Sequence, residues 1–343
     1  MSGQVERQAP GPVRDADAQG RASPAPTAPP AGPGVEGRLG VWRARGRLAL
    51  LGFREGWRVF AESPIGLLGL AIIVLFGVMA VSHPILMATV WDPAVYDPVT
   101  GFGFDRPDHP APPSWRHLLG TDPLGRDVLS QLTASTSSAF ILGMVAALVT
   151  VGIATVVGAV AAYFGGLVDT LLMRLADLII IMPTISLLIV LTALFGLNLF
   201  QLALVLGVLG GFGGTAVVIK SQALSVKVKP YIEAARLAGG GPFHIIRVHI
   251  VPNLLPLSLL YMMFTVTGAI FSEAVLSFFG ILNVRMSWGI MIHTASTGGY
   301  LLGGTKYWWL IVPAGAAITL LCSSFYLVGR ALDEVVNPRL RRR

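Results

Sequence analysis

The sequence predicts an all-α, polytopic membrane protein with six transmembrane helices. Hydrophobic residues make up 54% and charged residues only 13% of the 343 residues, whereas a soluble domain has about 25% charged residues. The mean hydropathy is +0.70. Several charge-free apolar stretches also exceed the roughly 20 residues that a helix needs to cross the bilayer core. The lone cysteine, Cys322, excludes a disulfide framework and a thiolate metal cluster.

The N-terminal part of the chain precedes these apolar stretches. Residues 1–40 are rich in Pro, Ala and Gly and have almost no large apolar side chains, so we expect a disordered cytoplasmic tail. Residues 41–62 mix arginines with tryptophan, leucine and phenylalanine. This mixture favours an amphipathic helix on the cytoplasmic face of the membrane over a merely basic flank of the first span.

Six transmembrane helices account for the apolar stretches. A turn at Gly196, Leu197 and Asn198 divides the long run 178–219 into two helices. To within a few residues, the expected helices span 65–83, 139–163, 177–196, 199–219, 253–275 and 308–329. Trp288, Tyr307, Trp308 and Trp309 are expected in an aromatic belt at the outer membrane boundary.

The remaining residues define the other segments. The first span lies within 63–83, and a polar, Pro-rich segment at 84–138 is long enough for a small external cap or re-entrant structure. A transmembrane core then occupies 139–330, followed by a cytoplasmic C-terminal tail at 331–343.

Lys and Arg in the short loops predict that both termini are cytoplasmic. With the N-terminus inside, the outer loops contain only five basic residues, which are Arg106, Arg116, Arg126, Arg285 and Lys306. The inner segments collect the other basic residues that flank the spans, including those at 220–247. A positive excess placed in this way is a topogenic signal. The sequence shows no basic groove interleaved with aromatic residues, which is the pattern that would indicate nucleic acid binding.

The external segment contains a group of titratable residues, His117, Asp122, Arg126 and Asp127. A metal or acid–base site would require these side chains to converge and would need a third strong ligand. The Asp-Pro and Gly-Arg-Asp contexts instead favour turn capping by Asp122 and Asp127, or pairing with Arg126. We expect no metal site.

A polar island at 229–252 separates two long apolar runs. It predicts a short helix that starts with Pro230 in its first turn, has Glu233 near the positive end of the dipole and stops at the glycines from Gly239 onward. Ala234 and Ala238 lie one turn apart, so this helix surface has few side chains and allows close approach by another body. Pro252 is expected to start the next helix.

This island resembles a known sequence feature. Glu233-Ala234-Ala235, Gly239 and Pro252-Asn253 resemble the EAA loop of ABC importer permeases, whose coupling helices dock on a cytoplasmic ATPase. The run Leu119-Gly120-Thr121-Asp122 with Gly125-Arg126-Asp127 is similar to the segment before the second span in dipeptide, oligopeptide and nickel importer permeases. The resemblance covers residue 50 to the end and points to the second, C-type permease subunit.

The resemblance implies a type I permease fold in a prokaryotic inner membrane, with cytoplasmic coupling helices. It also implies a heterodimer with a homologous permease, two ATP-binding subunits inside and a substrate-binding protein outside. No G-x-x-x-x-G-K-[ST] occurs in the chain, so ATP and Mg would be bound by the partner ATPases. The ATPase-coupling residues implied are Tyr231, Glu233, Ala234, Ala235, Arg236, Gly239 and Pro252.

The resemblance further implies that the cargo is a di- or oligopeptide, with nickel or another small solute as the alternative. The chain would then be a transport subunit rather than an enzyme. Another class, an ATP-independent channel or carrier, usually has several ionisable groups within the membrane, and a membrane-embedded enzyme would use His117, Asp122 and Asp127. Glu273 is the one acidic residue set late in an apolar span. It either faces the pore as a gate or is hydrogen-bonded to Ser272 or Ser277.

Overall fold

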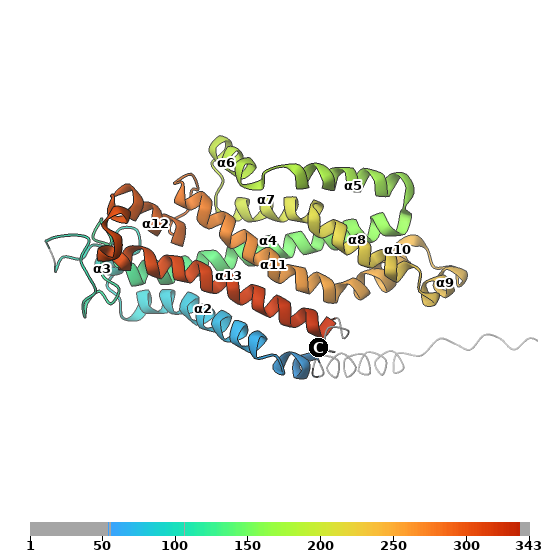
Figure 1. Cartoon of the computed structure of the whole chain (residues 1–343), viewed down its shortest axis with the longest axis horizontal. Helices are drawn as coiled ribbons and strands as arrows, with labels where there is room; N and C mark the ends of the chain where they lie inside the picture. Colours follow the sequence, from blue (N-terminus) through green and yellow to red (C-terminus); the bar gives the residue numbers. More distant parts are fainter. Residues whose placement is uncertain (1–53, 55, 106, 337–343) are drawn as a thin grey trace, which may run out of the picture. The chain divides into compact units, whose positions relative to one another are not determined.

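The computed structural model describes residues 54, 56–105 and 107–336 (Figure 1). The expected tail 1–40, most of the expected amphipathic helix 41–62 and the end of the C-terminal tail lie outside the described residues. Residues 56–61 are helical. Within them, Phe60 is buried against Val328 and Ala331, so this segment packs against the last helix of the chain.

The described part of the chain is helical and contains no strand. Its α-helices are α2 (Pro64–Thr89), α3 (Pro93–Tyr96), α4 (Val128–Phe164), α5 (Gly166–Ile181), α6 (Thr184–Phe195), α7 (Leu199–Phe212), α8 (Gly214–Lys227), α9 (Pro230–Leu237), α10 (Pro242–Ile245), α11 (Val251–Phe278), α12 (Trp288–Thr297) and α13 (Trp308–Val336). A π-helical turn, η1 (Ile246–Ile250), precedes α11, and a 3-10 helix, η2 (Tyr300–Tyr307), precedes α13. The expected all-α fold is confirmed.

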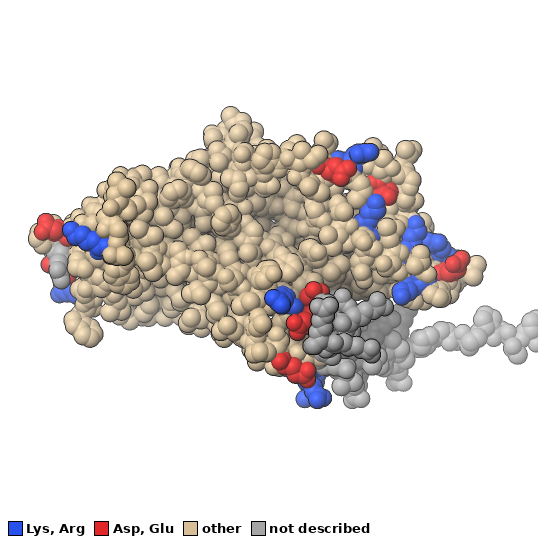
Figure 2. Space-filling view, in the orientation of Figure 1, with Lys and Arg blue, Asp and Glu red and all other residues tan. Residues whose placement is uncertain are grey.

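Four of the described helical stretches are long and apolar enough to cross a membrane, and two bent pairs raise this number to as many as six. The pairs are α5 with α6, bent by 85°, and α7 with α8, bent by 41°. Figure 2 shows charged side chains near the two ends of the molecule and a broad uncharged surface between them. The chain is therefore a multi-pass membrane protein.

The third expected span, 177–196, is wrong as a single helix. It contains the end of α5 and all of α6, and the break lies at Met182 and Pro183. Met182 is extended because the residue before proline avoids the α region. The turn expected after this span is confirmed, since Gly196 adopts a left-handed conformation and Asn198 forms a capping box with Gln201.

Helices extend into both ends of the segment 84–138 that was expected between the first two spans. Helix α2 continues through Pro84 to Thr89. Proline leaves the carbonyl four residues earlier without its helical donor, and the Ser137 hydroxyl of α4 donates to that oxygen, on Ala80, at 2.8 Å. Helix α4 begins at Val128, and hydroxyls such as those of Thr133 and Thr136 donate to carbonyls of their own helix. We call residues 90–127 the cap segment.

Two further expectations differ from the structure near the spans. Helix α13 continues to Val336, beyond the limit expected at 330. Trp288 is 1% exposed and donates from Nε1 to the Leu132 carbonyl at 3.1 Å, so it lies in the core rather than in an aromatic belt. An indole buried with its N–H satisfied contributes most to packing.

Helix α4 is the centre of the helical bundle. It contacts α2, α7, α8 and α11 (Figure 1). Small residues permit these close approaches: a Cβ on Gly158 would lie 2.7 Å from the Lys220 amide nitrogen, and one on Gly211 would lie 2.6 Å from the Ile153 Cβ. This packing positions the loop between α8 and α11, residues 228–250, at one end of the bundle and the cap segment at the other.

Candidate functional site

The local sequence determines where helix α9 begins and where it ends. Pro230 occupies its first turn, as expected, together with Glu233. The helix stops because Gly239 adopts a φ of +84°, a conformation that glycine reaches at no steric cost. The Gly240 amide then donates to the Ala235 carbonyl at 2.9 Å, which satisfies a carbonyl at the helix end.

One face of α9 is anchored on the bundle. Ile232 is fully buried in a cluster that includes Ile245, Ile250 and Leu254. The Arg236 guanidinium carbon lies 5.2 Å from the centroid of the Tyr163 ring at the end of α4, a cation–π contact. Helix α9 is therefore packed against the end of α4 and the start of α11.

The opposite face of α9 and α10 is open. Tyr231, Glu233 and Ala234 of α9 are exposed, as is Gly239 after it, whereas Ala235 is half-buried. The other two expected coupling residues, Arg236 and Pro252, are also exposed, although Arg236 contacts Tyr163 and Pro252 lies in α11. Leu237 and Phe243, which the sequence analysis did not single out, are 85% and 83% exposed. Large apolar side chains held in the open beside charged ones mark a surface suited to another protein.

Pro252 lies in the first turn of α11, as expected, although this helix is continuous with the helical turns before it. A helical stretch runs without a break from Pro242 to Phe278, and Pro252 lies within it. The π-helical turn of η1 immediately precedes this proline. A π-turn shifts the hydrogen-bond pattern to i→i+5 and so accommodates a residue that has no N–H. No pattern in the sequence predicts such a turn.

The titratable residues of the cap segment form two separate groups. The Arg126 Nε donates to Asp122 Oδ2 at 2.7 Å, and Asp127 caps the first turn of α4, as their turn-forming contexts predicted. His117 Nδ1 lies 2.8 Å from Asp127 Oδ2, and its Nε2 lies 3.1 Å from Asp105 Oδ1. Among the described residues, no set of three or more His, Cys, Asp or Glu side chains could hold a metal ion.

Glu273 lies in α11 and is 2% exposed. The Ser277 hydroxyl donates to its Oε1 at 2.6 Å, whereas Ser272 donates to the Gly268 carbonyl of its own helix at 2.8 Å. Of the two serines considered as partners, Ser277 is therefore the one that binds Glu273. The role of Glu273 as a gate stays a prediction.

A crevice of about 450 Å³ opens between α5, α6, α7 and α11. Its lining combines apolar side chains with glycines and hydroxyls, including Gly210, Gly213, Thr184, Thr265 and Ser272. Sequence reasoning missed it, although the glycine pairs at 210–214 were visible. The lining is mostly apolar and contains no charged side chain.

The comparisons with known proteins bear on these surfaces. The model of the family described as "Binding-protein-dependent transport system inner membrane component" matches residues 154–342. The chain belongs to this family. The match to this inner-membrane component family includes α5 to α13 and so contains α9, α10 and Glu273.

Individual relatives extend the match beyond the family region. The chain is 31% identical to the dipeptide transport system permease protein DppC of Bacillus subtilis over 292 residues, which is 84% of this chain and 86% of the relative. It is 32% identical to the oligopeptide transport system permease protein OppC of the same organism over 286 residues, or 82% and 88% of the two chains. For OppC of Haemophilus influenzae the identity is 33% over 228 residues, or 66% and 71%.

Proposed function

We propose that this chain is a transmembrane subunit of an ATP-driven importer of short peptides. Three relatives whose names include dipeptide or oligopeptide transport are 31–33% identical to it, which supports peptides over nickel as the cargo. The chain provides a pathway and does not hydrolyse ATP, because it contains no phosphate-binding P-loop. ATP and Mg belong to the partner subunits.

The proposed partners follow from the family to which the chain belongs. A homologous permease forms the other half of the pore, two ATP-binding subunits attach inside, and a substrate-binding protein delivers peptide outside. The excess of Lys and Arg around α8 to α10 supports a cytoplasmic location for this end (Figure 2). The cap segment is then external, and both termini are cytoplasmic.

The observation that carries the proposal is the two-faced placement of α9. Ile232 fixes one face to the buried cluster with Ile245 and Leu254, and the other face leaves Glu233 and Leu237 exposed. ATP-driven closure of the partner ATPases would move α9, and the packed contacts would pass this motion to α4 and α11. The pore between the two permeases would then open alternately to each side.

Peptide uptake in cells tests this proposal. Cells lacking this gene should lose uptake of labelled dialanine, and the wild-type gene should restore it. Glu233→Lys should insert in the membrane at the wild-type level but not restore uptake. Glu62→Lys makes the same charge change at an exposed site near the start of α2, so it should restore uptake. Wild-type uptake with Glu233→Lys would overturn the coupling role, and restored uptake of nickel but not of dialanine would overturn the cargo.

A further inference from the structure

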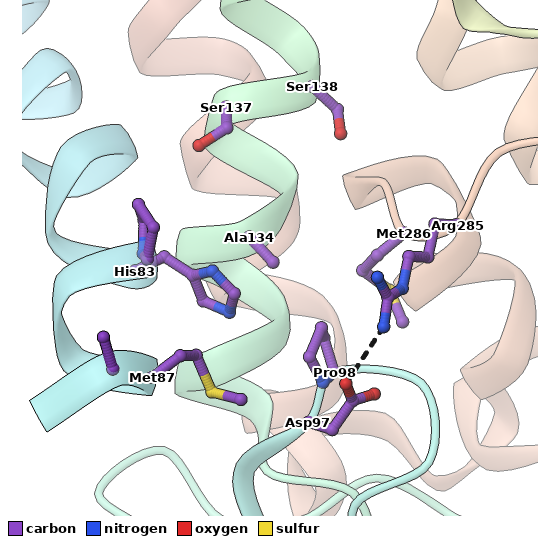
Figure 3. A pocket seen from close by; sticks show the side chains of 11 residues that line it. His83, Met87, Asp97, Pro98, Ala134, Ser137, Ser138, Arg285 and Met286 are labelled. Carbon is purple, nitrogen blue, oxygen red and sulfur yellow. Dashed lines mark hydrogen bonds and ion pairs between the residues drawn. The ribbon is translucent and has the colours of Figure 1, made fainter. Parts of the chain in front are cut away.

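A second cavity lies at the opposite end of the bundle from α9. It has a volume of about 650 Å³, within the range of roughly 300–1,000 Å³ typical of small-molecule sites. Four parts of the chain line it: the end of α2, the loop after α3, the first turns of α4 and the loop before α12 (Figure 3). We call it the cap pocket.

The cap pocket contains one fixed negative charge. The backbone N–H groups of Val99 and Thr100 each donate to Asp97 Oδ1 at 2.9 Å, so Oδ2 is left for other partners. Burial raises the pKa of Asp97, but these hydrogen bonds and Arg285 outweigh it, and the net pKa is lowered. The carboxylate is therefore ionised and held in place by the cap segment.

The positive charge of the cap pocket is only partly engaged. Arg285 Nη2 donates to Asp97 Oδ2 at 3.1 Å, and the dashed line in Figure 3 marks this contact. The Arg285 side chain is nevertheless 76% exposed. Since a guanidinium has five N–H donors, most of them remain free for an anionic group of a ligand.

The rest of the cap pocket combines apolar side chains with the polar side chains of Ser137, Ser138 and His83. Met87 and Met286 line it, and methionine side chains adjust to ligands of different shape. His83 points its ring into the same space in Figure 3, and its buried Nε2 has no hydrogen-bond partner. A buried polar atom without a partner is uncommon in a native structure, so this nitrogen is a further polar group that faces the pocket.

We propose that the cap pocket binds a short zwitterionic peptide by its charged termini. The peptide carboxylate pairs with Arg285, its ammonium group pairs with Asp97, and its side chains lie against Met87 and Met286. A lone anion would be repelled by Asp97 and a lone cation by Arg285, so the pair selects a ligand with both charges. The peptide as cargo rests on the function proposed above, and the pocket would hold it where it enters the permease.

Matched peptides and variants test this site directly. The full chain in lipid nanodiscs is titrated with dialanine, with dialanine amide and with N-acetyl-dialanine, and binding is followed by ligand-observed NMR. The wild type should prefer dialanine over each blocked peptide by about fivefold or more, since each blocked terminus removes a charge-assisted contact. Arg285→Gln should abolish only the preference over the amide, and Asp97→Asn only the preference over the acetylated peptide.

Two controls separate recognition from structure. Arg116→Gln removes an exposed arginine of the cap segment outside the pocket and should leave both preferences intact. Ala134→Leu fills the pocket without changing its charge and should weaken binding of all three peptides. If Arg285→Gln and Asp97→Asn weaken all three peptides equally, or none of them, the ion pair only ties the cap segment to the loop before α12, and the proposal fails.

Uptake measurements distinguish failure of this site from failure of the proposed function. If cells take up dialanine but the wild-type chain shows no preference for free termini, the site is wrong and the importer stands. If the deletion does not affect uptake of dialanine but the wild-type chain shows both preferences, the importer is wrong and the site stands.

Discussion

Asp127 and His117 form a buried pair in which the Asp127 carboxylate contacts both the first turn of α4 and the cap segment. Its Oδ1 accepts the Ser130 N–H at 2.7 Å and caps α4, while its Oδ2 lies 2.8 Å from His117 Nδ1. The other ring nitrogen of His117 lies 3.1 Å from Asp105 Oδ1. Both ring nitrogens donate only when the imidazole is protonated. Accordingly, the hydrogen bond to Asp127 raises the pKa of His117, although burial opposes it.

We expect the backbone amides of the cap segment to be better protected from hydrogen exchange at about pH 6 than at about pH 9. Because the pKa of His117 is raised in the folded state, the protonated ring contributes fully to stability below the unfolded pKa of about 6.5. That contribution is lost as the pH rises through the folded pKa. Hydrogen exchange of residues 101–127, corrected for the intrinsic pH dependence, measures it.

Histidine variants identify the group that titrates. His117→Gln should remove the pH dependence of protection in the cap segment. His244→Gln replaces an exposed histidine on α10 and should leave that dependence unchanged. Equal behaviour of the two variants, or protection that increases with pH, would contradict this role of His117.

Gly289→Ala should destabilise the protein by about 1–3 kcal/mol, the usual cost of overpacking. A Cβ at this position of α12 would lie 2.6 Å from the Ser277 Cβ and 3.0 Å from the Phe278 amide nitrogen of α11, and closer still to the Ala274 carbonyl oxygen. Two of these neighbours are backbone atoms, which cannot rotate away. The midpoint of thermal unfolding of the purified chain measures the loss.

Gly315→Ala is the matched control for this prediction. Gly315 lies in α13, and a Cβ there would meet nothing within 4 Å. Its unfolding midpoint should stay at or somewhat above that of the wild type, because no neighbour opposes the new methyl group and alanine favours a helix over glycine by about 1 kcal/mol. Similar midpoints for the two variants would show that α12 can move away from α11.

Local features of the structure could be predicted from the sequence, and contacts between distant segments could not. The pairing of Arg126 with Asp122, the start of α9 at Pro230 and its termination before Gly239 involve residues within a few positions of one another. By contrast, Asp97 and Arg285 are separated by 188 positions, and no pattern in the sequence brings them together.

The same distinction explains the errors. The continuation of α2 through Pro84 depends on Ser137, 57 positions from the carbonyl that it serves. The burial of Trp288 depends on Leu132, 156 positions away. Composition gives the number of apolar stretches, but the partner of a polar atom in a helical bundle is set by tertiary packing.

Glu273→Leu should lower stability by about 1–3 kcal/mol, because it removes the acceptor of the buried Ser277 hydroxyl. Glu273→Gln retains a side-chain oxygen that can accept this hydrogen bond, so its unfolding midpoint should stay near that of the wild type. Uptake of dialanine by Glu273→Gln then separates the two roles of the residue. Normal stability with altered uptake supports a gate, whereas normal stability with normal uptake restricts Glu273 to a structural role.

Gly239→Asp should abolish peptide uptake while the protein still folds and inserts. Gly239 has a left-handed conformation, which aspartate adopts at a cost of about 1–2 kcal/mol. A Cβ at this position would meet nothing within 4 Å, so the chain itself has room for the side chain. The new carboxylate would project from the exposed face of α9 that we propose as the ATPase-docking surface. Uptake of dialanine and the amount of protein in the membrane are the two measurements.

Gly239→Asn separates the effect of charge from that of backbone strain. Asparagine enters the left-handed region as readily as aspartate and has nearly the same size, but it adds no charge to the docking surface. If α9 docks on a charged partner surface, Gly239→Asn should retain a measurable fraction of uptake and Gly239→Asp none. If both variants abolish uptake equally, the conformation at the end of α9 is the requirement. If both transport like the wild type, this end of α9 is not in contact with the ATPase.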